Sequence, residues 1–546
     1  MVFALTATRT DNSKIFLGLL SLAILAAIIP TTNGARILSV YSFPGKSHFM
    51  MQKAIIKELV RNGHQVTLIT AFSLAPLNLG SNYTEILIEP VYDFWKDVKE
   101  DAGARNIFEF TTMDMAGFLQ MLQVLGVATT EHALKQPKVQ EIINAKQTEN
   151  VYDLLLVEQF YQEAFLALSH IYKIPVVSSS TLGYQNQMSQ MFGIISPWSF
   201  VPHGFLPFSD RMSFWERVQN TYNSLYEDLH REYVYFPLMD DLVTKYFGHL
   251  PISFPKVTEM EKNLSVMLLN SFAPLTSPRP TIDGMVPVGG MHIYPPKALP
   301  ADMQKFLDEA EHGAIYFSLG SNVESKDMPP AYLKIFLDVF RSMKQRVLWK
   351  FENESIINLP PNVMVKKWMP QSDILAHPNV RVFITHGGLL GTQEGVYHAV
   401  PMLGMPFYCD QHLNLKKAEL YGYAISLHFQ SITYDVLRNA LTELLENPSY
   451  RANIKRISSI FHDRPLNARD TAVYWIEYVI RHKGASHLRA AGLDLKWYQF
   501  YLLDVITFVV AGILLTLWLL ISLVRFALRR LGKGSKQKEV KKQKRQ

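Results

Sequence analysis

The stretch FITHGGLLGTQEG, Phe383 to Gly395, joins an apolar strand to a helix through two adjacent glycines. The apolar run ends at Thr385, and the helix is expected to begin at Gly387-Gly388, where no side chain blocks an approaching anion. The first turn of a helix offers free N–H groups and the positive end of the helix dipole. His386 can donate one more hydrogen bond. The stretch therefore predicts a phosphate cradle at the end of a strand.

Glu394 stands seven residues beyond Gly387, which is two helical turns along the same face. A carboxylate at that place can accept hydrogen bonds from both hydroxyls of a ribose. A single His-Gly-Gly after a strand is a weak signal on its own, because glycine at such a turn is commonly structural. The local pattern leaves a nucleotide site and a structural turn as alternatives.

The chain around this stretch alternates strands and helices. Buried parallel strands are near-continuous apolar runs. Six such runs are predicted in the second half, with helices between most of them and further helices from Tyr434 to Lys483. The runs are AIYFSLG (314–320), RVLWKF (346–351), NVMVKKW (362–368), VRVFIT (380–385), VPMLGMP (400–406) and AISLHF (424–429).

The first half has the same alternation. RILSVYSF (36–43), a helix over 48–63 and QVTLIT (65–70) form one strand–helix–strand unit, which recurs with DLLLV (153–157), a helix over 163–171 and PVVSSS (175–180). Two doubly wound α/β domains facing a cleft are therefore expected, with ligands beyond the carboxyl ends of the strands. The predicted domains are 35–283 and 284–490, and the Pro-rich stretch 274–300 is expected to link them. The Met- and aromatic-rich segments 111–126 and 184–208 fit either core helix and loop or an apolar acceptor pocket.

Two apolar segments predict the topology. Residues 1–34 fit a secretory signal peptide, with charges before an apolar centre from Ile15 to Ile29 and small residues after it. Val505–Val524 has twenty uncharged residues, enough for about 30 Å of helix, the thickness of a bilayer core. The basic tail, 525–546, favours the cytosolic side. Its end, KQKRQ, resembles dibasic retrieval signals for the endoplasmic reticulum; a general polybasic anchor is the alternative.

Charge and cysteine content exclude other classes. The net charge is +6, but residues 525–546 hold ten Lys and Arg against one Glu, which leaves 44 basic and 47 acidic side chains in the body. The body therefore has no support for nucleic-acid binding. The one cysteine, Cys409, excludes an intramolecular disulfide and a cysteine-rich zinc site. Three sequons, Asn82, Asn263 and Asn353, are candidate glycosylation sites in the predicted lumenal part.

The longer stretch FITHGGLLGTQEGVYHAVPMLGMPFYCDQ, Phe383 to Gln411, resembles the signature of the UDP-glycosyltransferase superfamily, as does WMPQSDILAHP upstream, Trp368 to Pro378. The signal segment, two-domain pattern, membrane span and basic tail are similar to the membrane-bound animal members. The strings VYSFPGKSHF, LLLVEQF and THGGLLGTQE look most like the arthropod branch. The resemblance implies the GT-B fold, with acceptor bound by the N-terminal half and UDP-sugar by the C-terminal half.

The resemblance also implies residue roles in donor binding. Leu390 occupies a position where vertebrate members have a phosphate-side asparagine, so backbone amides are expected to contribute more there. The implied roles are Trp368 stacking on uracil with Gln371 beside it, Ser318 near the diphosphate, His386, Gly387 and Gly388 on the phosphates, Glu394 on the ribose, and Asp410 and Gln411 on the sugar.

The catalytic base implied by the resemblance is His48, at the end of the loop PGKSH. Imidazole suits removal of a hydroxyl proton near neutral pH. The residue that orients it in vertebrate and plant members is an aspartate; here Glu158 falls at that place, and Asp153 starts the strand instead. Glu158 at the rim of the cleft, with another group orienting His48, is the alternative.

The expected reaction is an inverting transfer of a hexose, glucose above all, from a UDP-sugar to a hydroxyl of a small lipophilic acceptor. No metal or other cofactor is expected. The alternatives are the same reaction with UDP-glucuronate and a non-catalytic membrane-anchored binder of small lipophiles. The expected setting is the endoplasmic reticulum membrane, with one pass, a lumenal body and a role in detoxification. Acceptor identity and oligomeric state, a homo-oligomer included, stay open.

Overall fold

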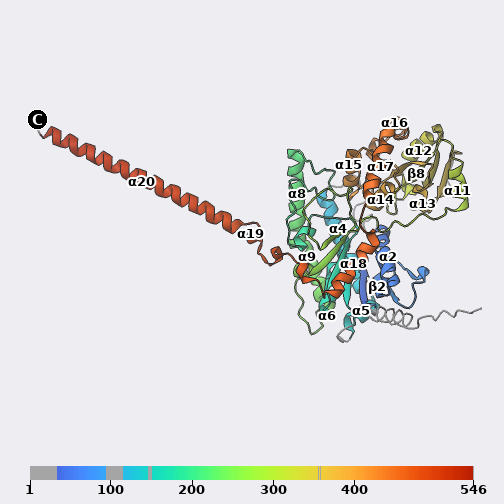
Figure 1. Cartoon of the computed structure of the whole chain (residues 1–546), viewed down its shortest axis with the longest axis horizontal. Coiled ribbons are helices and arrows are strands. Elements are labelled where there is room, and N and C mark those ends of the chain that lie inside the picture. The colour runs from blue at the N-terminus through green and yellow to red at the C-terminus, as the bar shows by residue number, and fades with distance from the viewer. Residues whose placement is uncertain are drawn as a thin grey trace, which may run out of the picture.

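The computed structural model describes residues 34–93, 108, 115–145, 151–354, 356 and 358–544. The apolar centre of the predicted signal peptide, Ile15–Ile29, lies outside the described residues, as do the last two residues of the basic tail. The body has two lobes, and one long helix, α20, leaves it on one side (Figure 1).

The first lobe is built on a parallel sheet of seven strands in the order β3-β2-β1-β4-β5-β6-β7. Strands β4 and β5 are buried along their whole length, as expected for a sheet covered by helices on both faces. Neighbouring residues point to opposite faces: Leu38 and Val40 join one apolar cluster, and Ile37 and Tyr41 join the other. The strands are β1 (Arg36–Tyr41), β2 (Gln65–Thr70), β3 (Tyr83–Leu87), β4 (Leu154–Glu158), β5 (Val176–Ser180), β6 (Leu264–Leu269) and β7 (Met285–Pro287).

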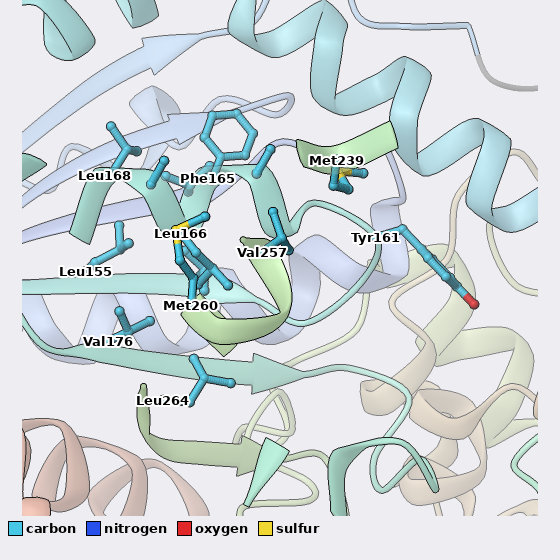
Figure 2. Close-up of a cluster of buried hydrophobic side chains, with 14 of the residues drawn as sticks. Leu155, Tyr161, Phe165, Leu166, Leu168, Val176, Met239, Val257, Met260 and Leu264 are labelled. Carbon is cyan, nitrogen blue, oxygen red and sulfur yellow. The ribbon is translucent and has the colours of Figure 1, made fainter. Parts of the chain in front are cut away.

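The core on one face of this sheet combines strand residues with short helices. Figure 2 shows Leu155, Val176 and Leu264, from β4, β5 and β6, gathered with Leu166 and Val257. Among the described residues, the helices of this lobe that lie before β7 are α2 (Lys46–Arg61), the 3-10 turn η1 (Ala75–Leu77), α4 (Met115–Leu134), α5 (Pro137–Asn144), the 3-10 turn η3 (Glu163–Leu166), α6 (Ala167–Tyr172), α7 (Met188–Met191), α8 (Phe214–His230), the π-helical turn η4 (Arg231–Tyr235), α9 (Phe236–Phe247) and α10 (Val257–Glu261).

The second lobe contains a parallel sheet of six strands in the order β10-β9-β8-β11-β12-β13. All six predicted strands of the second half are present. The strands are β8 (Ala314–Ser318), β9 (Arg346–Lys350), β10 (Val363–Lys366), β11 (Val380–Thr385), β12 (Met402–Gly404) and β13 (Ala424–Ser426). The helices are α11 (Ala301–Asp308), α12 (Pro330–Ser342), α13 (Gln371–Leu375), α14 (Leu389–Tyr397), α15 (Gln411–Leu420), α16 (Tyr434–Glu446) and α17 (Pro448–His462).

The first sheet continues past the expected division at residue 283/284. Strand β7 lies within the predicted linker and pairs with β6. Helix α18 (Ala468–Arg481) packs on α2 and β6, although it follows the second lobe in sequence. A three-residue strand ending in proline has no readable periodicity, and an apolar helix stripe does not reveal which sheet it covers. Strand β7 therefore escaped prediction, and α18 was predicted as a helix but assigned to the second domain.

The C-terminal segment forms the short helix α19 (Trp497–Phe500) and the helix α20 (Leu503–Gln543). Its part Leu503–Gly532 is long and apolar enough to cross a membrane and is not buried in the fold. The predicted span, Val505–Val524, lies within it. The helix continues through most of the basic tail (Figure 1).

Candidate active site

His48 lies in the first turn of α2, just after the loop that follows β1. It is 8% exposed, and its ring contacts the rings of Phe43 and Phe160, with centroids 4.9 and 4.4 Å away, while these two rings also contact each other. Gly45 precedes the helix, and a Cβ there would lie 3.1 Å from the His48 ring and 2.8 Å from the Phe43 ring. The turn into α2 thus packs the imidazole against apolar groups.

Glu158, the last residue of β4, contacts His48 directly. His48 Nδ1 lies 2.6 Å from Glu158 Oε1, although the residues are 110 positions apart. Strands β1 and β4 are neighbours, so the end of one and the helix after the other meet at the carboxyl edge of the sheet. Asp153 lies at the opposite end of β4, where it pairs with Arg36 at 3.0 Å. The structure therefore brings together the two residues predicted as base and orienting carboxylate.

Three further residues, which the sequence did not reveal, form a hydrogen-bonded chain that ends on this carboxylate. Thr181 Oγ1 donates to Glu158 Oε1 at 2.7 Å, and Gln52 Nε2 donates to Thr181 Oγ1 at 3.1 Å. Ser179 Oγ in turn donates to Gln52 Oε1 at 3.0 Å. Gln52 follows His48 by four residues, one turn along α2, and is a polar residue on the buried face of an amphipathic helix. A polar residue on the buried face of this helix was the one feature of the sequence that could have indicated the role of Gln52.

On the second lobe, Gly387 and Gly388 form the turn between β11 and α14. Gly387 has φ of +82°, and a Cβ there would lie 2.5 Å from Leu415 Cγ. Gly388 is the residue before the helix. Only glycine fits at Gly387, and the first N–H groups of α14 point out of the turn with no partner one turn earlier in the helix.

The ring of His386 lies in a slot between Gly388 and Gly320. Cβ atoms built on these glycines would both lie 2.5 Å from the ring. Burial lowers the pKa of His386 to about 4, and Lys350 adds to the effect. Its Nδ1 makes no hydrogen bond within the described part of the chain. His386 is therefore a neutral imidazole beside the helix terminus near pH 7.

Glu394 lies on α14 and accepts a hydrogen bond from Gln371 Nε2, at the start of α13. Burial raises the pKa of Glu394 to about 7, and the hydrogen bond from Gln371 partly opposes that effect. His292 Nε2, in the segment between the lobes, lies 3.9 Å from Glu394 Oε1. His292 belongs to no motif, so its place beside Glu394 could not be predicted.

Asp410 and Gln411 begin α15. Burial raises the pKa of Asp410 to about 6, and Asn414 Nδ2 donates to its Oδ2 at 2.8 Å. Gln411 Oε1 accepts from the N–H of Phe407 at 2.8 Å, which orients its amide group. Interaction with His48 lowers the pKa of Asp410, so the start of α15 lies near the His48–Glu158 pair of the first lobe.

The remaining predicted donor residues lie at the same edge of the second sheet. Ser318 ends β8, next to Thr385 in the sheet register, and is 2% exposed. Trp368 follows β10 by two residues, and its side chain is 70% exposed. Both residues lie at the carboxyl ends of strands, and so does the turn at Gly387.

Gln393 joins helix α14 to the first lobe, and no feature of the sequence indicated this contact. Its Oε1 accepts from Gly290 N at 2.9 Å, and its Nε2 donates to the Asn270 carbonyl oxygen at 3.0 Å. Gln393 precedes Glu394 on α14. Helix α14, which carries the predicted ribose ligand Glu394, is therefore hydrogen-bonded to the residue that follows β6.

The comparisons with known proteins agree with this geometry. Solved glycosyltransferases share the fold: VinC, in complex with dTDP, has a TM-score of 0.56 at 16% identity over 82% of this chain and 100% of its own. CalG4, the calicheamicin glycosyltransferase, has a TM-score of 0.55 at 16% identity over 82% and 99%. The two parallel sheets form the two Rossmann-like domains of the GT-B fold.

The sequence relatives are closer. UDP-glycosyltransferase UGT5 of Dactylopius coccus is 35% identical over 89% of this chain and 91% of its own length. UDP-glucuronosyltransferase 2B15 of Homo sapiens is 30% identical over 90% and 93%. The pattern of the family described as "UDP-glucoronosyl and UDP-glucosyl transferase" matches residues 37–538. The chain therefore belongs to this family of UDP-glycosyltransferases.

Proposed function

We propose that this enzyme transfers glucose from UDP-glucose to a hydroxyl of a small lipophilic acceptor, with inversion at the anomeric carbon. The observation that carries the proposal is the 2.6 Å contact between His48 and Glu158 at the carboxyl edge of the first sheet. The rings of Phe43 and Phe160 beside His48 support an apolar acceptor. Phe118 of α4, 6.2 Å from the Tyr408 ring, adds a further aromatic group near the start of α15.

In the proposed reaction His48 Nε2 takes the proton of the acceptor hydroxyl. The Nδ1–H group donates to Glu158, which holds the ring and stabilises its cation. The acceptor oxygen forms a bond to the anomeric carbon from the face opposite the diphosphate. The bond from that carbon to the phosphate oxygen breaks, and its electron pair leaves with UDP.

We assign the departing charge to the end of α14. The N–H groups after Gly388 and the neutral ring of His386 offer hydrogen bonds to the diphosphate, and the helix dipole favours its negative charge. Trp368 stacks on uracil with Gln371 beside it, Ser318 lies near the diphosphate, Glu394 binds the ribose, and Asp410 and Gln411 bind the sugar hydroxyls. No metal has a part in this proposal.

We propose glucose rather than glucuronate as the donor sugar because Asp410 itself carries a negative charge. Asn414 Nδ2, which donates to Asp410 Oδ2 at 2.8 Å, belongs to a neutral amide that does not offset the charge of this carboxyl. A sugar carboxylate next to Asp410 would bring two like charges together, which is unfavourable. The family includes relatives named for both sugars, such as UDP-glucosyltransferase 2 of Dactylopius coccus, 34% identical, so UDP-glucuronate is the second candidate.

Microsomes that contain the enzyme test the donor and the reaction together. They are incubated with UDP-glucose or UDP-glucuronate and a panel of phenols and steroids, and products are identified by mass. We expect hexosides from UDP-glucose. Glucuronides alone would reverse the donor assignment, and acceptor binding without product would favour a non-catalytic binder.

We further propose that the enzyme resides in the endoplasmic reticulum with a lumenal body and a cytosolic tail. The tail sequence and the exposed sequon residues Asn263 and Asn353 support this setting, and Asn82 is half-exposed. Protease added to sealed microsomes should remove only the last twenty or so residues. Digestion of the body would contradict the orientation.

A further inference from the structure

One face of α8 and of η4 carries a line of large apolar side chains in contact with solvent. Their spacing is three or four residues, so they form one continuous stripe along the helix. Each is between 42% and 73% exposed. The apolar stripe consists of Trp215, Val218, Tyr222, Leu225, Leu229 and Tyr233.

The opposite face of the same helix is polar and buried. Asn220 Oδ1 accepts from His203 N at 2.7 Å, and Glu227 Oε2 lies 2.9 Å from His203 Nε2. Arg231, in η4, donates to Glu261 Oε1 at 2.9 Å. Turning the helix to bury the stripe would leave these polar groups without partners, which is unfavourable. The outward position of the stripe is therefore fixed by the fold.

The stripe lies on the side of the body from which α20 departs. Gln190 Nε2 donates to Asp228 of α8 at 2.7 Å, and Gly193, three residues later, packs on Leu493, so closely that a Cβ would lie 2.6 Å from the Leu493 nitrogen. The approach to α20 is thus docked beside α8. Figure 1 shows α8 along this side of the body, running across the direction of α20.

Apolar exposure continues from α8 to the start of α20. Trp497 is 69% exposed, and Tyr501 and Leu502 are 50% and 58% exposed. Tryptophan and tyrosine are enriched where a protein meets the headgroup region of a bilayer. Soluble monomers rarely expose contiguous apolar patches of this kind.

We propose that the apolar stripe of α8 lies in the headgroup region of the bilayer that α20 enters. An amphipathic helix in this position buries its apolar face about 5–10 Å into the boundary between headgroups and acyl chains. The acidic Glu216 and Glu232 accompany the stripe, so burial of apolar surface, and not attraction to anionic lipid, drives the contact. The acceptor lobe then rests on the membrane surface.

The test places a fluorophore on the full-length chain in phosphatidylcholine vesicles that contain a lipid with a nitroxide on its upper acyl chain. Tyr222→Cys carries the label on the stripe, Lys344→Cys carries it on the exposed far lobe, and Leu514→Cys carries it in the middle of α20. The parent chain, with Cys409 alone, gives the background labelling. Iodide in the water measures solvent access to each label.

We expect the nitroxide lipid to quench most of the Tyr222→Cys signal and little of the Lys344→Cys signal, with iodide showing the reverse order. Replacing Leu225 and Leu229 by Glu should return the Tyr222→Cys label to the Lys344→Cys level. Three results would overturn the proposal: a Tyr222→Cys label open to iodide, a label shielded from iodide but not quenched by the lipid, as in contact with a second copy, and no quenching at Leu514→Cys.

Discussion

His48 and His386 stand at the two sides of the active site, and their surroundings differ. The Nδ1 atom of His48 contacts the Glu158 carboxylate at 2.6 Å, so a positive charge on this ring has a partner. The ring of His386 lies between two glycines, its Nδ1 has no hydrogen bond among the described residues, and its pKa falls to about 4. The same side chain therefore has a carboxylate partner on one lobe and stays neutral without one on the other.

The two lobes also differ in how their sites are assembled. The proposed donor side takes most of its polar residues from one continuous stretch around β11, α14 and α15. The proposed acceptor side joins α2, the end of β4 and the residue after β5. Substitutions of His48 and Glu158 on the first lobe should therefore change the rate of transfer, and substitutions of His386 and Glu394 on the second should change the binding of the nucleotide.

The largest effect is expected for His48→Ala. Loss of a general base typically costs about 10²–10⁴-fold in rate. The kcat for glycoside formation should fall accordingly, while UDP affinity, measured by calorimetry, should stay unchanged. His386→Ala is the matched variant, and it should weaken UDP. If His48→Ala turns over normally, the acceptor side holds no base at this position.

Glu158 tests whether the carboxylate stabilises the imidazole cation. Glu158→Gln keeps the shape and removes the charge, so kcat should fall at least about tenfold, a barrier increase of about 1.4 kcal/mol. Glu158→Asp keeps the charge with a shorter reach and should have intermediate activity. Wild-type turnover by Glu158→Gln would mean that another group orients His48.

The donor side should show a pH effect through Glu394, whose pKa burial raises to about 7. Below this pH the free enzyme holds the side chain protonated, and a carboxylate accepts two ribose hydroxyls better than a carboxyl group does. Uridine affinity should therefore fall as pH drops from 7, by at most about tenfold per pH unit, since one proton must be lost. Uridine is the probe because it carries no titrating phosphate.

Glu394→Gln should bind uridine more weakly and without this pH dependence. Asp410→Ala should keep the wild-type uridine affinity and its pH profile, but transfer more slowly. A pH profile that survives in Glu394→Gln would assign the titration to another group.

The smallest effect is expected for Thr181→Val, which removes one hydrogen bond to Glu158. Such a bond is worth about 0.5–1.5 kcal/mol, so kcat should fall about two- to tenfold with KM for UDP-sugar unchanged. Thr392→Val is the control on the donor side, because the buried Thr392 hydroxyl makes no hydrogen bond in the described part of the chain. Equal kcat values in the two variants would remove Thr181 from the support of Glu158.

The elements built from one continuous stretch of sequence could be predicted more easily than those assembled from distant residues. Strands β8 to β13 and the turn at Gly387 could be predicted, because an apolar run or a pair of glycines indicates the local structure without knowledge of distant contacts. The Gln52–Thr181 support of Glu158 and the bridge made by Gln393 depend on residues brought together by the fold. Helix α8 shows a further limit, since its apolar periodicity indicates a helix but cannot tell which face is buried. Here Asn220 and Glu227 decide it, through partners elsewhere in the chain.

The position of helix α18 late in the sequence affects how the chain folds during its synthesis. Its residues Ala472, Val473 and Ile476 complete an apolar cluster with Ile37 and Leu59 of the first lobe. Roughly 180 residues separate β7 from α18, so at about 5–20 residues per second a ribosome needs roughly 10–40 s to supply the missing helix. During that interval the first lobe has its whole sheet but an uncovered flank on α2 and β6. The newly made chain is then a substrate for chaperones, and a chain ending before Ala468 would keep that flank open permanently.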